Sequence, residues 1–514
     1  MADYGTGRDA AYALRLQSAL EEFASQYELN LEAHRKRRTI FLFPGGLGSQ
    51  LMRADQPFPH PAAVYDKVWL DAGDLCKDAP DVPRLAMLPG GRDSEQKYVI
   101  ADGCVNIPGS FGPVHPYLNF TEWCHRNFID LFTVGWDWRR SVQDAADFFL
   151  KTFLPMFDAR FGGQTPHPLD HFSFVGHSAG GMVIKAILHA TADQYVQRVK
   201  KAITVATPFY GYDGQIHQYL KGNTLVPLDR SVSAKIVSSM PGGYEYLYLD
   251  HETYLANKAA FESDPDSRYN LMAYPSMDRD DPNLPADPYD AEPDDNGMVR
   301  YPMQHGFESS LLYRANVVAR HISSPLTDKA IAGKFYNIRG VQSENGKVAN
   351  NTTVSQTWGR IAPEFDPDHD PDPIAVTNGP GDTVQPAWTT RLHGIADDHV
   401  ITIIGDDIEH MVMMELPSVQ KKIAELLGLD PNVVTFKSGN VAQLAASRAE
   451  LDTFVEGMRT VTADPTTAPH RRKAVRSAFL RKLTPEQRQG LLVRFYLDAL
   501  KGATGSASPN STEQ

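Results

Sequence analysis

The chain has 514 residues, of which 42% are hydrophobic and 22% charged, and its formal net charge at pH 7 is −13. This length and composition allow a large buried core. The negative charge argues against nucleic acid as a partner and provides no attraction to an anionic membrane surface. Three cysteines are too few for a disulfide scaffold and odd in number, which favours reduced thiols in a cytoplasmic protein.

Targeting signals are not visible in the sequence. The N-terminal residues lack the apolar segment of a signal peptide, and no stretch reaches the roughly 18 apolar residues that a transmembrane helix needs. The sequence therefore predicts a cytoplasmic protein without a transmembrane segment, for which any contact with a lipid surface is peripheral.

The first predicted element is an amphipathic helix. Leu16, Leu20, Phe23 and Tyr27 follow one another at intervals of four, three and four residues, which places them on one helical face. We expect residues 1–38 to form a helical brace against the core.

Short apolar segments then alternate with helical patterns. Buried strands are predicted at 39–43, 131–136, 171–175, 202–206, 335–341 and 400–404. Helices are predicted at 143–157, 182–189 and 419–427. This alternation predicts an α/β fold, with a mostly parallel sheet covered on both faces, over residues 39–430.

Two segments within this domain are too long to be simple connections. Residues 52–104 and 210–333 are predicted to form a lid and a cap over the site. Beyond the domain, a capping box at Thr484, Pro485 and Gln487 supports a helical C-terminal extension over 431–502. Residues 503–514 are expected to be a disordered tail.

The most informative motif is Gly176-His177-Ser178-Ala179-Gly180. It follows the predicted strand 171–175 and precedes the predicted helix 182–189. A sharp turn between a strand and a helix, with small residues around a serine, is the context of a nucleophile elbow. The motif alone is a weak signal, but its placement makes Ser178 the candidate nucleophile.

A serine nucleophile needs a base, and the base needs an acid that orients it. In α/β hydrolases these residues follow in the order Ser, Asp or Glu, His. Asp382 lies in a glycine-rich loop after the 335–341 strand, and His410 follows the 400–404 strand. Rival acids are Asp397, Asp398, Asp406 and Asp407. We prefer Asp382 because its glycine-rich turn can present the carboxylate above the sheet.

The tetrahedral intermediate of acyl transfer also needs two N–H donors directed at its oxyanion. One is expected from Ala179, the residue after the candidate nucleophile. The other is expected from the loop 44–49, where three glycines allow the backbone to approach a substrate closely.

Several further motifs stand in order along the chain. Residues 43–51 (FPGGLGSQL) are followed by 69–71 (WLD), 105–112 (VNIPGSFG), 136–139 (WDWR) and 207–211 (TPFYG). With the segments 381–384 and 409–412 around Asp382 and His410, this ordered set resembles the lecithin:cholesterol acyltransferase and lysosomal phospholipase A2 family of α/β hydrolases. The resemblance runs in pieces from about residue 39 to residue 427.

This resemblance implies a serine enzyme that acts on ester bonds of lipids through an acyl-enzyme. It implies Gly46 and Ala179 as oxyanion donors, and Leu47 and Trp69 as residues near the substrate. No metal or organic cofactor is needed for this chemistry. Water or a second alcohol would release the acyl group from Ser178.

Other interpretations stay open at this point. The acidic charge and the missing signal peptide favour a hydrolase of a soluble ester or lactone, and a non-catalytic binding protein on the same scaffold is a third possibility. Trp69 and Tyr65 fit either a tip that grips lipid or ordinary core aromatics. Acyl-chain length, headgroup, acyl acceptor and oligomeric state are not predicted.

Overall fold

The computed structural model describes residues 6–29, 38–54, 65–69, 85–88, 90–93, 98–105, 116–164, 167–211, 236–247, 259, 309–358 and 374–429. The predicted C-terminal extension 431–502 and tail 503–514 lie outside the described residues, as do large parts of the predicted lid and cap. Within the described residues, no helix has the length and apolar character needed to cross a bilayer.

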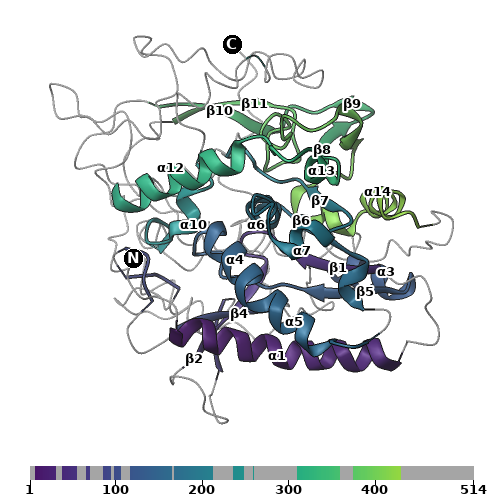
Figure 1. Cartoon of the computed structure of the whole chain (residues 1–514). Coiled ribbons are helices and arrows are strands. Elements are labelled where there is room, and N and C mark those ends of the chain that lie inside the picture. The colour runs from purple at the N-terminus through teal and green to yellow at the C-terminus, as the bar shows by residue number, and fades with distance from the viewer. Residues whose placement is uncertain are drawn as a thin grey trace, which may run out of the picture.

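A parallel sheet forms the centre of the molecule (Figure 1). Its strands run in the order β12-β8-β7-β6-β1-β5, and every neighbouring pair on this path is parallel. Their bounds are β1 Arg38–Phe43, β5 Ile129–Thr133, β6 Phe172–His177, β7 Ala202–Val205, β8 Phe335–Glu344 and β12 Val400–Gly405. A short strand, β9 (Lys347–Val348), pairs antiparallel with β8. The predicted α/β fold is confirmed, and each of the six predicted strands is present.

Both faces of the sheet are covered because side chains alternate along each strand. Phe41 and Phe43 of β1 belong to one core cluster, and Ile40 and Leu42 belong to the other. The first cluster contains residues of α4 (Val142–Phe148), the π-helical turn η1 (Phe149–Phe153), α5 (Leu154–Arg160) and α6 (Ala179–Leu188). The second contains residues of α3 (Leu118–Arg126) and α14 (Pro417–Leu427).

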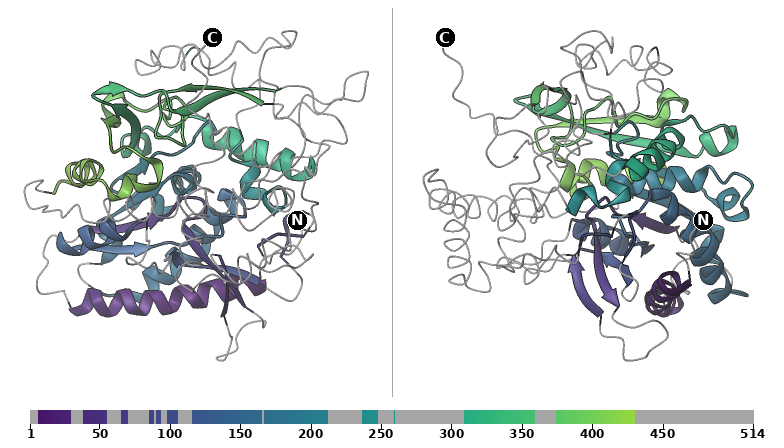
Figure 2. Two further views of the ribbon diagram at one scale, coloured as in Figure 1. Left: turned by 180° about the vertical axis from the view of Figure 1, so that it is seen from behind. Right: turned by 90° about the vertical axis from the view of Figure 1, so that its left-hand side faces the viewer.

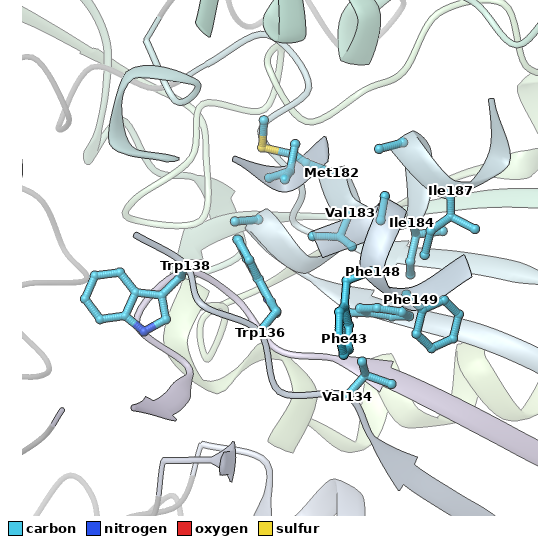
Figure 3. Close-up of a cluster of buried hydrophobic side chains, with 14 of the residues drawn as sticks. Phe43, Val134, Trp136, Trp138, Phe148, Phe149, Met182, Val183, Ile184 and Ile187 are labelled. Carbon is cyan, nitrogen blue, oxygen red and sulfur yellow. The ribbon is translucent and has the colours of Figure 1, made fainter. Parts of the chain in front are cut away.

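The first cluster is rich in aromatic rings (Figure 3). Phe43 lies against Phe149, with ring centroids 5.0 Å apart, and against Phe174 at 5.8 Å. Apolar side chains of α6, including Val183 and Ile184, close this cluster from the other side. Such packing fixes the strand β1 and the helix α6 relative to each other.

The predicted N-terminal helix is present as α1 (Thr6–Leu29). The four residues of its predicted apolar face are all buried. Phe23 meets Phe132 of β5 and Phe161, with ring centroids 5.7 and 5.9 Å apart. The helix therefore packs on the core as a brace (Figure 1).

The inserts and the segment after β9 contain structure that the sequence pattern did not predict. Strands β2 (Ser49–Ala54), β3 (Tyr65–Trp69) and β4 (Tyr98–Cys104) form an antiparallel sheet in the order β3-β2-β4, which lies beside α1 (Figure 2). A hairpin of β10 (Thr352–Trp358) and β11 (Ile374–Gly379) follows β9. The remaining elements are η2 Pro168–Asp170, α7 Gln194–Arg198, α10 Pro241–Tyr244, α12 Ser309–Ser323, α13 Lys329–Ala332, η5 Asp397–His399 and η6 His410–Glu415.

A buried ion cluster ties the first insert to the core. The Arg139 guanidinium lies 2.7 Å from an Asp137 oxygen and 2.9 Å from an Asp93 oxygen, and Arg140 lies 2.8 Å from the other Asp93 oxygen. Burial alone would raise the pKa of Asp93, but Arg139 and Arg140 lower it to about 2. The segment around Asp93 is thereby fixed to the loop that follows β5.

Candidate active site

Ser178 stands in a strained turn between β6 and α6, with φ 53° and ψ −131°. Two glycines at the start of α6, Gly180 and Gly181, leave no room for a Cβ atom. A Cβ at Gly180 would come within 2.1 Å of the Phe43 carbonyl oxygen, and one at Gly181 within 1.8 Å of Thr207 Oγ1. The turn therefore has the strand-turn-helix geometry of a nucleophile elbow. Ser178 is 9% exposed.

His410 and Asp382 form a buried pair at the same end of the sheet. His410 Nδ1 lies 2.8 Å from Asp382 Oδ2, and the exposed fractions of the two residues are 1% and 0%. The other Asp382 oxygen accepts from the N–H groups of Val384 and Gln385, at 3.2 and 2.6 Å. Because a carboxylate can only accept, Nδ1 of His410 is the protonated nitrogen, and Nε2 is left to act as a base.

Contacts of His177 bring this pair next to the elbow. The His177 ring, one residue before Ser178, lies with its centroid 4.9 Å from that of His410. Its Nε2 is 2.9 Å from the His410 carbonyl oxygen. The structure thus brings Ser178, His410 and Asp382 together at the carboxyl ends of β6, β8 and β12.

Two of the rival acids have other partners. Asp397 pairs with Arg391 at 2.8 Å, and its side chain is exposed. Asp406 accepts a hydrogen bond from Ser343. The acid that contacts His410 is therefore Asp382, the residue that the sequence analysis preferred.

The loop after β1 lies directly against the elbow. A Cβ at Gly45 would come within 2.9 Å of the Ser178 Cβ, and a Cβ at Gly46 within 3.8 Å of the Ala179 Cβ. Leu47 has a positive φ of 64°, which a leucine rarely adopts. Gly45 and Gly46 therefore pack against Ser178 and Ala179, as an oxyanion site formed by this loop and the elbow requires.

Three tryptophans hold this loop by its carbonyl groups. The indole N–H of Trp136 donates to Pro44 at 2.8 Å, that of Trp69 to Leu47 at 2.8 Å, and that of Trp138 to Ser49 at 3.2 Å. A carbonyl that is tied back fixes the orientation of the peptide plane, and hence the direction of the next N–H. No residue within the described ranges accepts from the N–H of Gly46 or Leu47.

The N–H of Ala179 is the first of helix α6. A helix provides no internal acceptor for its first N–H groups, and its N-terminus favours negative charge. Ala179 in the elbow and Gly46 in the adjoining loop are thus the candidate oxyanion donors.

Trp69 is 1% exposed and packs edge-on against Trp138, with ring centroids 5.2 Å apart. Of the two interpretations of this residue, the structure shows the buried one, so the exposed tip is wrong for Trp69. The side chain of Tyr65 lies outside the described residues. The link from Trp69 to the substrate loop is its bond to Leu47, and a direct contact with substrate stays a prediction.

Backbone strain gathers at this end of the sheet. Six described residues other than glycine have a positive φ. Four of them follow strands at the site: Leu47 after β1, Ser178 after β6, Ala206 after β7, and Thr383 beside Asp382. Strained backbone clusters at functional sites, where the surrounding structure holds it.

Sequence reasoning missed Tyr117 and the contacts of His177. The Tyr117 hydroxyl accepts from the Gly45 N–H at 2.8 Å and lies 3.1 Å from His177 Nδ1. Burial and the nearby His410 lower the pKa of His177 well below its usual value. The only sequence signal for His177 was its place beside Ser178.

Comparison with known proteins gives little beyond the structure itself. No family model matches the chain, and no curated protein matches it. Among solved structures, a chain in the crystal structure of the Tle4-Tli4 complex is similar with 13% identity and a TM-score of 0.40, over 78% of this chain and 99% of that chain. A likeness of this degree carries no conclusion about function.

Proposed function

We propose that this protein is a serine-dependent carboxylic-ester hydrolase or acyltransferase that works through an acyl-enzyme on Ser178. The observation that carries the proposal is the buried His410–Asp382 pair, 2.8 Å apart, beside a strained serine turn. A serine becomes nucleophilic only when a base of this kind takes its proton.

The steps follow from the positions of these groups. Ser178 Oγ attacks the ester carbonyl while His410 Nε2 takes its proton, and the amides of Ala179 and the 44–49 loop stabilise the oxyanion. His410 then gives the proton to the departing alcohol. Water or an acceptor alcohol attacks the acyl-enzyme in the same way, which releases the acid or a new ester and restores Ser178.

Lipid esters are the proposed substrate class. The support is the ordered set of motifs that resembles the lecithin:cholesterol acyltransferase and lysosomal phospholipase A2 family. The described parts of the first insert are also fixed to the domain, since Trp69 bonds to Leu47 of the oxyanion loop and Asp93 to Arg139 after β5. An insert fixed in this way is placed to form one wall of the substrate pocket.

The first test is labelling with a fluorophosphonate, which reacts with activated serines. We expect mass spectrometry to find the adduct on Ser178, and Ser178→Ala to carry none. Equal labelling of the two proteins, or none in the wild type, would contradict the proposal and favour a binding protein on this scaffold.

The second test sets the substrate class. Hydrolysis of p-nitrophenyl esters is measured from acetate to palmitate, with Ser178→Ala as the blank at each length. Lipid ester specificity predicts Ser178-dependent rates that rise toward long, detergent-dispersed chains. A short-chain optimum would instead indicate a soluble ester or lactone as substrate.

A further inference from the structure

A chain of hydrogen bonds connects the oxyanion loop to the candidate base. It starts at the Gly45 N–H, which donates to the Tyr117 hydroxyl at 2.8 Å. The hydroxyl lies 3.1 Å from His177 Nδ1, and His177 Nε2 lies 2.9 Å from the His410 carbonyl oxygen. The side chains that form these hydrogen bonds, those of Tyr117 and His177, are buried.

The direction of each bond follows from what the end groups can do. The His410 carbonyl can only accept, so His177 Nε2 carries a proton. Burial keeps the imidazole neutral, so Nδ1 has no proton and accepts a hydrogen bond from the Tyr117 hydroxyl. The hydroxyl in turn accepts from Gly45, and every member is satisfied.

His410 is consequently held at both sides of its backbone. Its N–H donates to the Asp382 carbonyl at 2.8 Å, and its carbonyl accepts from His177. The His177 ring also lies against the His410 ring, at an interplanar angle of 37°. Removal of the His177 contact would free the backbone that orients the imidazole.

Tyr117 is itself fixed to the same segment. It precedes α3, and the carboxylate of Glu415, at the end of η6, accepts from the Asn119 N–H at 2.9 Å. Because η6 begins at His410, the hydroxyl of Tyr117 and the backbone of His410 are joined by two separate routes.

We propose that Tyr117 and His177 are positioning residues that set the oxyanion loop and the base His410 at the correct separation around Ser178. This inference rests on the proposed function. Both side chains are buried, and they act through the loop and through the backbone of His410. Loss of either changes the alignment of the reacting groups, and should lower kcat while KM stays nearly constant.

The test uses Tyr117→Phe, which removes one hydroxyl and keeps the ring. Its matched control is Tyr244→Phe, because Tyr244 is also fully buried and its hydroxyl donates to the Ser238 carbonyl at 2.8 Å. We expect Tyr117→Phe to lower kcat on the best p-nitrophenyl ester about 10- to 100-fold, the effect of leaving buried polar groups unpaired at the site. Each variant loses one buried hydroxyl, so we expect Tyr244→Phe to lower Tm about as much as Tyr117→Phe does. Tyr244→Phe should leave kcat within twofold of the wild type.

A second pair of variants separates positioning from folding. His177→Gln can still donate to the His410 carbonyl, whereas His177→Leu cannot. We therefore expect His177→Gln to have a higher kcat than His177→Leu, although the two variants have similar Tm values. In the double variant Tyr117→Phe/His177→Leu, the losses of kcat should be less than additive, because both substitutions break the same chain of hydrogen bonds.

The outcomes distinguish the two proposals. Absence of Ser178-dependent turnover in the wild type overturns the proposed function, and this inference with it. Turnover in the wild type with an unchanged kcat in Tyr117→Phe, or additive losses in the double variant, overturns this inference alone.

Discussion

Helix α6 has a pair of histidines near each of its ends, and the two pairs differ in their neighbours. At the N-terminal end, His177 and His410 lie 4.9 Å apart between ring centroids, and Asp382 binds His410. At the C-terminal end, His189 and His321 lie 3.7 Å apart. Their neighbour is Lys185, whose Nζ is 2.6 Å from His189 Nε2 and 2.6 Å from the Ser324 carbonyl.

The difference lies in the charge that each cluster can carry. Among the described residues, no carboxylate pairs with the C-terminal cluster. Burial lowers the pKa of Lys185 to about 7, and burial, Lys185 and His321 together lower the pKa of His189 to about 3. Lys185 and His189 therefore disfavour added protons, whereas His410 is paired with the carboxylate of Asp382 through Nδ1 at 2.8 Å. The partner carboxylate, Asp382, is therefore the feature that distinguishes the candidate base His410 from the histidines at the other end of α6.

The largest expected effect comes from breaking that acid pairing. Asp382→Asn removes the negative charge and permits the wrong tautomer of His410, so we expect kcat to fall by about ten-thousand-fold, as in other triads of this type. The control is Asp397→Asn, which removes an exposed carboxylate paired with Arg391 and should leave kcat unchanged. Equal activity of the two variants would show that Asp382 is not the orienting acid.

The sequence reveals the N-terminal cluster because chain order is part of its pattern. Buried parallel strands are short apolar runs, and a serine turn, an acid loop and a histidine loop follow them in a known order, so Ser178, Asp382 and His410 could be selected before their contact was seen. The residues that join them could not. Tyr117 is 72 residues from Gly45 and 60 from His177, and only the fold brings the three together.

The antiparallel sheet β3-β2-β4 escaped prediction for a different reason. Strand β2 reads Ser-Gln-Leu-Met-Arg-Ala, and this mixed pattern lacks the continuous apolar character of the central strands. Its register with β3 and β4 contains irregularities that no local pattern indicates. Insert structure of this kind depends on long-range pairing.

The second effect concerns stability at the C-terminal cluster. The folded-state pKa of Lys185 is about 7, below its ordinary value of 10.5, so between these values the unfolded chain binds more protons. The free energy of unfolding should therefore rise with pH from about 7 to 10, by up to about 1.4 kcal/mol per pH unit from this group. Lys185→Met removes the titrating group, and should flatten this slope in urea unfolding at a series of pH values. An identical slope in both proteins would contradict the assignment.

The third effect is smaller and tests how the oxyanion loop is held. Trp69→Phe removes the indole donor to Leu47 and keeps an aromatic ring, and we expect kcat to fall about tenfold, since one buried neutral hydrogen bond is lost. Trp123→Phe is the control, because Trp123 is equally buried and its indole nitrogen meets no acceptor among the described residues. Loss of stability in both variants with a loss of kcat in neither would mean that the tether does not set the loop.

The smallest expected effect is at His189. His189→Gln keeps an acceptor for Lys185 and removes the imidazole, and kcat should stay within twofold of the wild type. The physical reason is distance: α6 has 10 residues, which at about 1.5 Å per residue separates its ends by about 15 Å. The C-terminal pair therefore has no direct contact with the reacting groups. A tenfold fall in kcat at unchanged Tm would show that the two clusters are coupled through the helix. It would contradict the conclusion that only the N-terminal cluster affects catalysis.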